Sequence, residues 1–120
     1  MNMMTAGTNI KQRSIILLPF PFSDLSSNKK RPALVISSTN FNKTSEDVIC
    51  CLITSNPAAK NAIKITNKDM ESGFLEFDSK IKPYRLFTAS KDIIYKVLGK
   101  LSKEKSQLVI NELTGLVKIR

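Results

Sequence analysis

Short apolar runs separated by polar turns dominate the chain, and this pattern favours strands over helices. The first two runs, residues 15–18 and 33–36, have a length that suits a strand and is too short for a helix. A polar loop rich in serine, asparagine and lysine separates them. The pattern therefore predicts two core strands that present one basic loop.

Proline residues mark the ends of these two strands. Proline has no N–H to donate to a sheet, so Pro19 and Pro21 predict that the first strand ends there or lies at a sheet edge. Pro32 pushes the residue before it toward extended backbone. Arg31 is therefore expected to hold its guanidinium at a defined place, at the mouth of the second strand.

Later apolar runs predict further strands. Residues 48–54 are apolar and β-branched, which indicates a buried strand, and residues 62–66 alternate, which indicates a half-buried one. Residues 80–88 predict a strand whose broken alternation around Pro83 favours a bulge near an edge. Residues 93–101 predict a short strand or a turn.

The remaining segments predict loops and one helix. Residues 38–47 are rich in Ser, Thr and Asn and predict a loop with Phe41 as its single apolar anchor. Residues 67–73 predict a helical turn or a loop that closes on glycine. Ser102 is a good N-cap for a last helix. The apolar residues of that helix fall at helical spacing: Val109, Leu113, Leu116 and Val117.

Short strands followed by one helix predict an α+β fold, mainly β, in the form of a small antiparallel sheet or barrel. A chain of 120 residues that is 42% hydrophobic can bury one core. We expect a single domain over residues 14–120, after a flexible N-terminal segment at residues 1–13. No apolar run has the length of a bilayer span and the start lacks the order of a secretory signal, so we expect a cytoplasmic protein with no membrane partner.

The composition narrows the chemistry. A net charge of +9 indicates a polyanion or an acidic protein as partner, unless it is only a solvated face. The absence of histidine excludes the histidine pair that many ribonucleases use. The two cysteines, Cys50 and Cys51, are adjacent in an apolar run, so they are expected on opposite faces of a strand as core residues. They are too few for a zinc site, and we expect no metal and no cofactor.

Four pieces of the chain stand out together: LLPFPFSDLSSNKKRPALVIS, VICCLITSN, KIKPYRLFT and Gly99-Lys100-Leu101. In this combination they resemble the MazF/PemK-like toxins of bacterial type II toxin–antitoxin systems, over most of residues 15–101. The resemblance implies an SH3-like barrel and a homodimer. It also implies an endoribonuclease that cleaves single-stranded RNA, mRNA in particular, and an acidic antitoxin as partner. Where the family usually has Gly-Asp before the first strand, this chain has Arg13-Ser14.

The resemblance also assigns the chemistry. The family residues associated with cleavage map onto Arg31 and Thr54, and the implied reaction is attack of a ribose 2′-hydroxyl on the adjacent phosphate without a metal. Arginine suits phosphate binding because its planar fork pairs with two oxygens and stays charged. Thr54, or Ser55 beside it, could orient an oxygen by hydrogen bonding.

The proton acceptor is left open between two residues. The Arg-x-Asp of some family members falls on Lys82 and Tyr84, so tyrosine replaces the carboxylate, and its unperturbed pKa of about 10 makes it a weak base near neutrality. Asp24 in the basic loop is the other candidate. Further RNA contacts are expected from five residues: Lys29, Lys30, Ser55, Lys82 and Arg85.

Simpler interpretations of the same residues exist. Arg31 could pair with Asp24 to pin the loop, and Thr54 could satisfy a turn. Phe20 and Phe22 suit core or dimer packing better than base stacking. Two other functions also fit the sequence: a non-catalytic toxin of the same fold that binds DNA gyrase, and a basic nucleic-acid-binding module.

Overall fold

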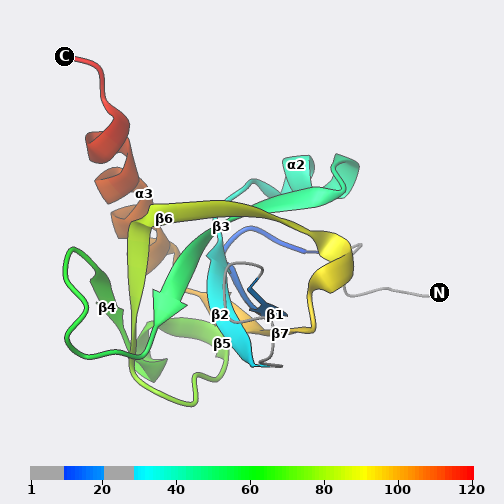
Figure 1. The fold of residues 1–120 in the computed structure, drawn as a ribbon, viewed down its shortest axis with the longest axis horizontal. Coiled ribbons are helices and arrows are strands. Elements are labelled where there is room, and N and C mark those ends of the chain that lie inside the picture. Colours follow the sequence, from blue (N-terminus) through cyan, green and yellow to red (C-terminus); the bar gives the residue numbers. More distant parts are fainter. Residues whose placement is uncertain (1–9, 21–28) are drawn as a thin grey trace.

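The computed structural model describes residues 10–20 and 29–120, and these form one curled antiparallel sheet with a helix at its C-terminal end (Figure 1). In the described residues the strand order is β4-β6-β3-β2-β1-β7-β5. The strands are β1 (Ser14–Pro19), β2 (Lys30–Val35), β3 (Asp47–Thr54), β4 (Ile63–Ile65), β5 (Met70–Gly73), β6 (Ser79–Ser90) and β7 (Lys96–Leu101). The predicted mainly β fold with a C-terminal helix is confirmed.

Pro19 and Pro32 act as the sequence predicts, whereas Pro21 lies outside the described residues. β1 lies between β2 and β7, so it is an interior strand, and it ends at Pro19. Pro32 lies inside β2 opposite Leu17, but β2 pairs with β3 only from Ala33 onward. No ladder bond toward β3 therefore depends on an N–H at Pro32.

The sheet buries side chains on both of its faces. Ile16, Ala33 and Cys50 belong to one core cluster, whereas Ile15 and Cys51 belong to the other. Both cysteines are free and fully buried, as their alternation predicts. Burial raises the pKa of each thiol to about 12.

Residues 38–47 do not form the predicted loop. They contain a short helix, α2 (Thr39–Thr44), whose N-cap Ser38 accepts a hydrogen bond from the Phe41 N–H. Phe41 is 42% exposed, so the predicted apolar anchor is wrong. The anchor is Asn42, which is 1% exposed and donates from Nδ2 to the carbonyl oxygens of Ile10 and Ser37.

Arg13 makes the entry into β1 without the glycine that is usual at this place in the family. Its φ of 76° lies in the left-handed region, which costs a non-glycine residue roughly 1–2 kcal/mol. Its N–H donates to the Val35 carbonyl, and its guanidinium donates to the Leu101 carbonyl (2.7 Å) and to Glu71 (2.9 Å). These bonds fix the start of β1 against β2 and β7.

Two 3₁₀ turns complete the sheet connections. The first, η1 (Asn67–Asp69), leads into β5, so the predicted helical turn is correct and the following residues are a strand. β5 ends at Gly73, whose φ is 79° and where an added Cβ would lie 2.2 Å from the Leu98 oxygen. The second turn, η2 (Lys91–Ile93), precedes β7.

The last helix, α3 (Lys103–Val117), begins at the predicted cap: Ser102 accepts a hydrogen bond from the Lys105 N–H. Only Ser106 and Val109 of α3 are buried. Leu116 and Val117 are exposed, because the end of the helix runs beyond the sheet (Figure 1). The predicted apolar stripe therefore packs on the sheet only in its first half. Within the described residues, no helix is long and apolar enough to cross a membrane.

Candidate active site

The sheet register brings Arg31 and Thr54 together. β2 and β3 are antiparallel, with Ala33 opposite Leu52 and Val35 opposite Cys50. Arg31 precedes Ala33 by two residues on β2 and Thr54 follows Leu52 by two on β3, so both lie just past the same end of this ladder. The two residues that the family resemblance links to cleavage thus lie at the same end of adjacent strands.

A cavity of about 310 Å³ opens at these strand ends. Its described lining residues are Leu17, Lys29, Lys30, Arg31, Pro32, Ile53, Thr54, Ser55, Leu75, Glu76, Phe77, Ser79 and Leu98. Five residues named from the sequence meet here: the Arg31–Thr54 pair, Ser55 and the two lysines. The cavity also contains a carboxylate, Glu76, beside an exposed aromatic ring, Phe77.

Sequence reasoning missed Glu76 and Phe77. They lie in the segment between β5 and β6, whose residues alternate too poorly to predict either a strand or a turn. One signal could have found them: the segment comes directly before β6, and the start of β6 pairs with the end of β3 at Thr54. Such a segment must therefore lie close to Thr54.

Arg31 is exposed, and within the described residues its side chain has no hydrogen bond and no ion pair. In this part of the chain no side chain occupies its guanidinium, which is therefore available to bind an anion. Asp24, the alternative partner and candidate base, lies outside the described residues, as does Phe22.

Thr54 has a structural role as well as a position at the site. Its Oγ1 accepts a hydrogen bond from the Asn56 N–H at 3.1 Å, so the interpretation as a turn-forming residue holds. A hydroxyl that accepts in this way keeps its own hydrogen to donate. Lys80 Nζ stabilises the same turn by donating to the carbonyl oxygens of Pro57 and Ala59, both at 2.9 Å.

A second cavity adjoins the first. Its volume is about 350 Å³, and Thr54, Ser55 and Ser79 line both cavities. The second cavity adds another carboxylate, Asp78, and another cation, Lys64. The turn after β3 therefore lies between two openings, each with one carboxylate.

The basic residues of β2 differ in their partners. Lys30 Nζ lies 4.7 Å above the centre of the Tyr95 ring, a cation–π contact. Tyr95 is itself fixed by its N–H, which donates to the Leu17 carbonyl at 2.8 Å. Lys30 is thus held beside the cavity, where its charge raises the local potential for phosphate.

The β6 residues that the sequence assigns to catalysis or RNA binding lie in or beside a bulge. Lys82 pairs with Leu52 and Leu86 pairs with Cys51, so the three residues between Lys82 and Leu86 face no ladder partner. Tyr84, in this bulge, is 46% exposed and is not among the described residues that line the Arg31 cavity. Arg85 lines a different cavity on β6. The bulge that the sequence predicts is confirmed.

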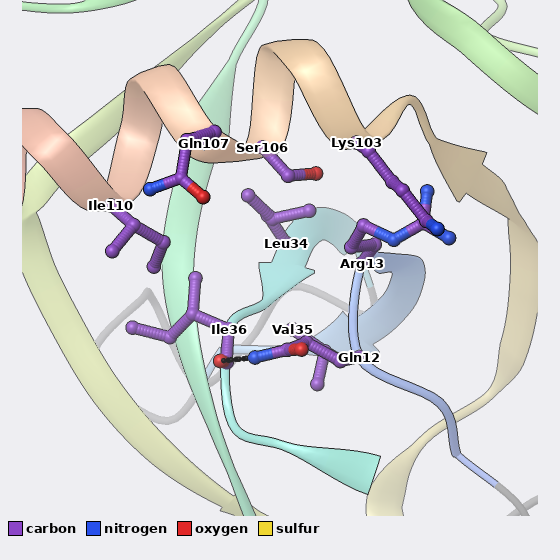
Figure 2. A pocket seen from close by; sticks show the side chains of 9 residues that line it. All are labelled: Gln12, Arg13, Leu34, Val35, Ile36, Lys103, Ser106, Gln107 and Ile110. Atoms are coloured by element: carbon purple, nitrogen blue, oxygen red, sulfur yellow. Dashed lines mark hydrogen bonds between the residues drawn. The ribbon is translucent and has the colours of Figure 1, made fainter.

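A further cavity in the described part of the chain lies away from these residues. It has a volume of about 550 Å³, and Figure 2 shows Ser106 and Ile110 of α3 reaching across it toward Leu34 and Ile36. No residue assigned to catalysis or RNA binding lines it. Residues 10–20 and 29–120 also contain no group of three or more Cys, Asp and Glu side chains that could hold a metal ion.

A family model described as "PemK-like, MazF-like toxin of type II toxin-antitoxin system" matches residues 11–117. The chain belongs to this family. No curated protein matches its sequence at a significant level.

Solved structures of MazF proteins share the fold. A MazE–MazF complex from Deinococcus radiodurans superposes with a TM-score of 0.75 at 15% identity, covering 93% of this chain and 99% of the other. An endoribonuclease in complex with its cognate antitoxin from a mycobacterial species gives 0.73 at 12% identity, with coverages of 93% and 96%. The Mycobacterium tuberculosis toxin MazF-mt6 gives 0.70 at 13% identity, with coverages of 90% and 99%.

Proposed function

We propose that this MazF/PemK-family protein is a metal-independent endoribonuclease toxin that cleaves single-stranded RNA, mRNA in particular, at a short sequence. The observation that carries the proposal is that Arg31 and Thr54 line one cavity together with two lysines and a carboxylate. Phosphate recognition, charge stabilisation and proton transfer each have a suitable group there.

The reaction is an internal transesterification. The ribose 2′-oxygen bonds to the adjacent phosphorus, the bond from phosphorus to the 5′-oxygen of the next nucleotide breaks, and a cyclic phosphate and a 5′-hydroxyl result. Arg31 pairs with the phosphate oxygens, whose charge increases in the transition state. Thr54 donates its hydroxyl hydrogen to a phosphate oxygen or holds the attacking hydroxyl in line.

One group must take the 2′-hydroxyl proton, and Glu76 is the best placed of the described residues because it lines the same cavity as Arg31. Tyr84 and Asp24, the two candidates from the sequence, have less support. Tyr84 lies on the β6 bulge, and a phenol is a weaker base than a carboxylate at neutral pH. In this mechanism the leaving 5′-oxygen takes up a proton from solvent.

The partners follow from charge and exposed apolar surface. The excess of cations over the whole chain suits an RNA backbone and an acidic antitoxin that competes with it. The far end of α3 exposes Leu116 and Val117, and Ile119 follows at 93% exposure, which supports a homodimer through this end of the chain. Because mRNA is the proposed substrate, the protein acts in the cytoplasm.

The test is cleavage of a long single-stranded RNA in EDTA by the wild type, Arg31→Ala and Lys43→Ala. The last variant removes a positive charge from an exposed position on α2. We expect discrete cuts with 5′-hydroxyl ends from the wild type and Lys43→Ala, and a loss of about 10²-fold or more in Arg31→Ala. A folded wild type that makes no cuts, or equal cutting by Arg31→Ala, would contradict the proposal.

A further inference from the structure

A small aromatic cavity lies on β6 apart from the Arg31 cavity. It has a volume of about 240 Å³ and is lined by Phe20, Leu52, Arg85, Leu86 and Phe87. The Phe20 and Phe87 ring centres are 5.0 Å apart, with the ring planes inclined at 58°. Both rings pack against one of the two core clusters, so their positions are fixed by the fold. The cavity is therefore a preformed pocket with aromatic walls.

The pocket and the Arg31 cavity meet along β3, because Leu52 lines the pocket whereas Ile53 and Thr54 line the cavity. Leu52 precedes Thr54 by two residues on β3, so their side chains share a face about 7 Å apart. Leu52 pairs with Ala33 on β2 and with Lys82 on β6. A strand of RNA whose phosphate lies on Arg31 therefore has the pocket within reach of a neighbouring nucleotide.

The chemistry of the pocket matches a nucleobase. Aromatic side chains offer faces or edges on which any base can pack, with little selectivity. Arg85 supplies the selectivity, because its fork donates two parallel hydrogen bonds, and in a base the matching pair of acceptors is O6 and N7 of guanine. Arg85 lies in the β6 bulge and has no ladder partner on β3. Its side chain is exposed, so it can approach a base.

We propose that this pocket binds the guanine of a nucleotide adjoining the scissile phosphate, and that Arg85 determines this preference. The inference rests on the proposed ribonuclease function and adds the base that the enzyme reads. It places base selection at the end of β1 and on the strands β3 and β6. A role for Arg85 in binding phosphate alone is the competing explanation.

The experiment begins with the cleavage sites of the wild type on a long RNA. The sites are expected to share one guanine within two nucleotides of the cut. A short single-stranded RNA with that site is then compared with a copy that carries 7-deazaguanine there, which removes only the N7 acceptor. Wild-type kcat/KM is expected to fall about tenfold with 7-deazaguanine, and Arg85→Ala is expected to cleave both RNAs equally.

Two variants separate base reading from simple charge. Arg85→Lys keeps the charge and loses the planar fork, so its ratio should fall below that of the wild type. Lys82→Ala removes a charge on the same strand, and it should cleave both RNAs more slowly while keeping the wild-type ratio. Thermal unfolding of each variant checks that the fold is intact.

The outcomes are distinct. Sites that share no guanine, or an Arg85→Ala enzyme that keeps the tenfold ratio, would overturn the guanine pocket and leave the ribonuclease proposal intact. Slower cleavage of both RNAs by Arg85→Ala at the wild-type ratio would assign Arg85 to phosphate and overturn the inference. A folded wild type that cleaves no RNA would overturn both proposals.

Discussion

Replacement of Asn42 by alanine should destabilise the fold more than any other single change to a polar side chain on α2. Asn42 is 1% exposed. Its Oδ1 accepts a hydrogen bond from the Ser37 hydroxyl, and its Nδ2 donates to the carbonyl oxygens of Ile10 (3.0 Å) and Ser37 (3.2 Å). Alanine leaves these three groups without their partner.

The size of the effect follows from those three groups. A buried polar group that loses its partner costs about 1–3 kcal/mol, and we take the low end because water can enter the space left by the amide. The expected loss is about 3 kcal/mol in the free energy of unfolding. For a domain of this size, that corresponds to a fall in Tm of about 10 °C.

Urea unfolding followed by circular dichroism measures this loss. The matched control is Asn40→Ala, which removes the same side chain from an exposed position of α2 and should change the stability by less than about 0.5 kcal/mol. The m-value should stay constant, because the surface exposed on unfolding does not change. A loss below about 1 kcal/mol for Asn42→Ala, or equal losses for both variants, would refute the reasoning.

Three further predictions concern charge and titration. The hydrogen bond from Arg13 lowers the pKa of Glu71 below its usual value of 4.5. The ion pair therefore stabilises the fold above pH 4.5, and this stabilisation is lost as the pH falls through the lowered pKa. Glu71→Gln should weaken the dependence of the urea unfolding free energy on acidic pH, and an unchanged dependence would contradict this role of the ion pair. Burial raises the pKa of Cys50 and Cys51 to about 12 from 9.0. The contribution of the buried, protonated thiols to stability is therefore complete below pH 9 and is lost as the pH rises toward 12. Ellman's reagent should react with both thiols only on unfolding, and fast reaction with the folded protein would contradict their burial. Glu76→Gln should lower kcat by about 10²-fold or more with little change in KM, and a variant with full kcat would remove Glu76 as the proton acceptor.

Strands β1, β2, β3, β4 and β6 were predictable from the sequence because their apolar runs are short and end at residues with clear backbone preferences, whereas β5 was missed. Pro19 ends β1, and the adjacent Cys50 and Cys51 lie on opposite faces, as strand geometry requires. The cap of α3 was equally clear, because Ser102 precedes a helical pattern. In each case the signal is local, so a single segment contains it.

The errors concern contacts between distant segments. Composition gives α2 the character of a loop, and the residue that holds it is Asn42, whose partner Ile10 lies 32 residues earlier in the chain. The spacing of Leu116 and Val117 predicts an apolar face but does not determine whether the chain covers it.

Part of the candidate site could be predicted in the same way. Arg31 and Thr54 were assigned through the family resemblance and their position at strand ends, but their meeting in one cavity depends on how β2 and β3 pair. Glu76 lies in an irregular segment that only the fold brings to the same cavity. Asp24 lies outside the described residues, so its role as a base stays a prediction.

The most direct measurement of the central claim compares two versions of one short RNA in EDTA. The first is all-ribose, and the second carries a single 2′-deoxyribose at the nucleotide whose hydroxyl would attack. The account predicts that the wild-type protein cleaves the first RNA to a cyclic phosphate and a 5′-hydroxyl and leaves the second RNA intact at that position. Cleavage of both RNAs, or cleavage that leaves a 5′-phosphate, would contradict the proposed transesterification at the Arg31–Thr54 site.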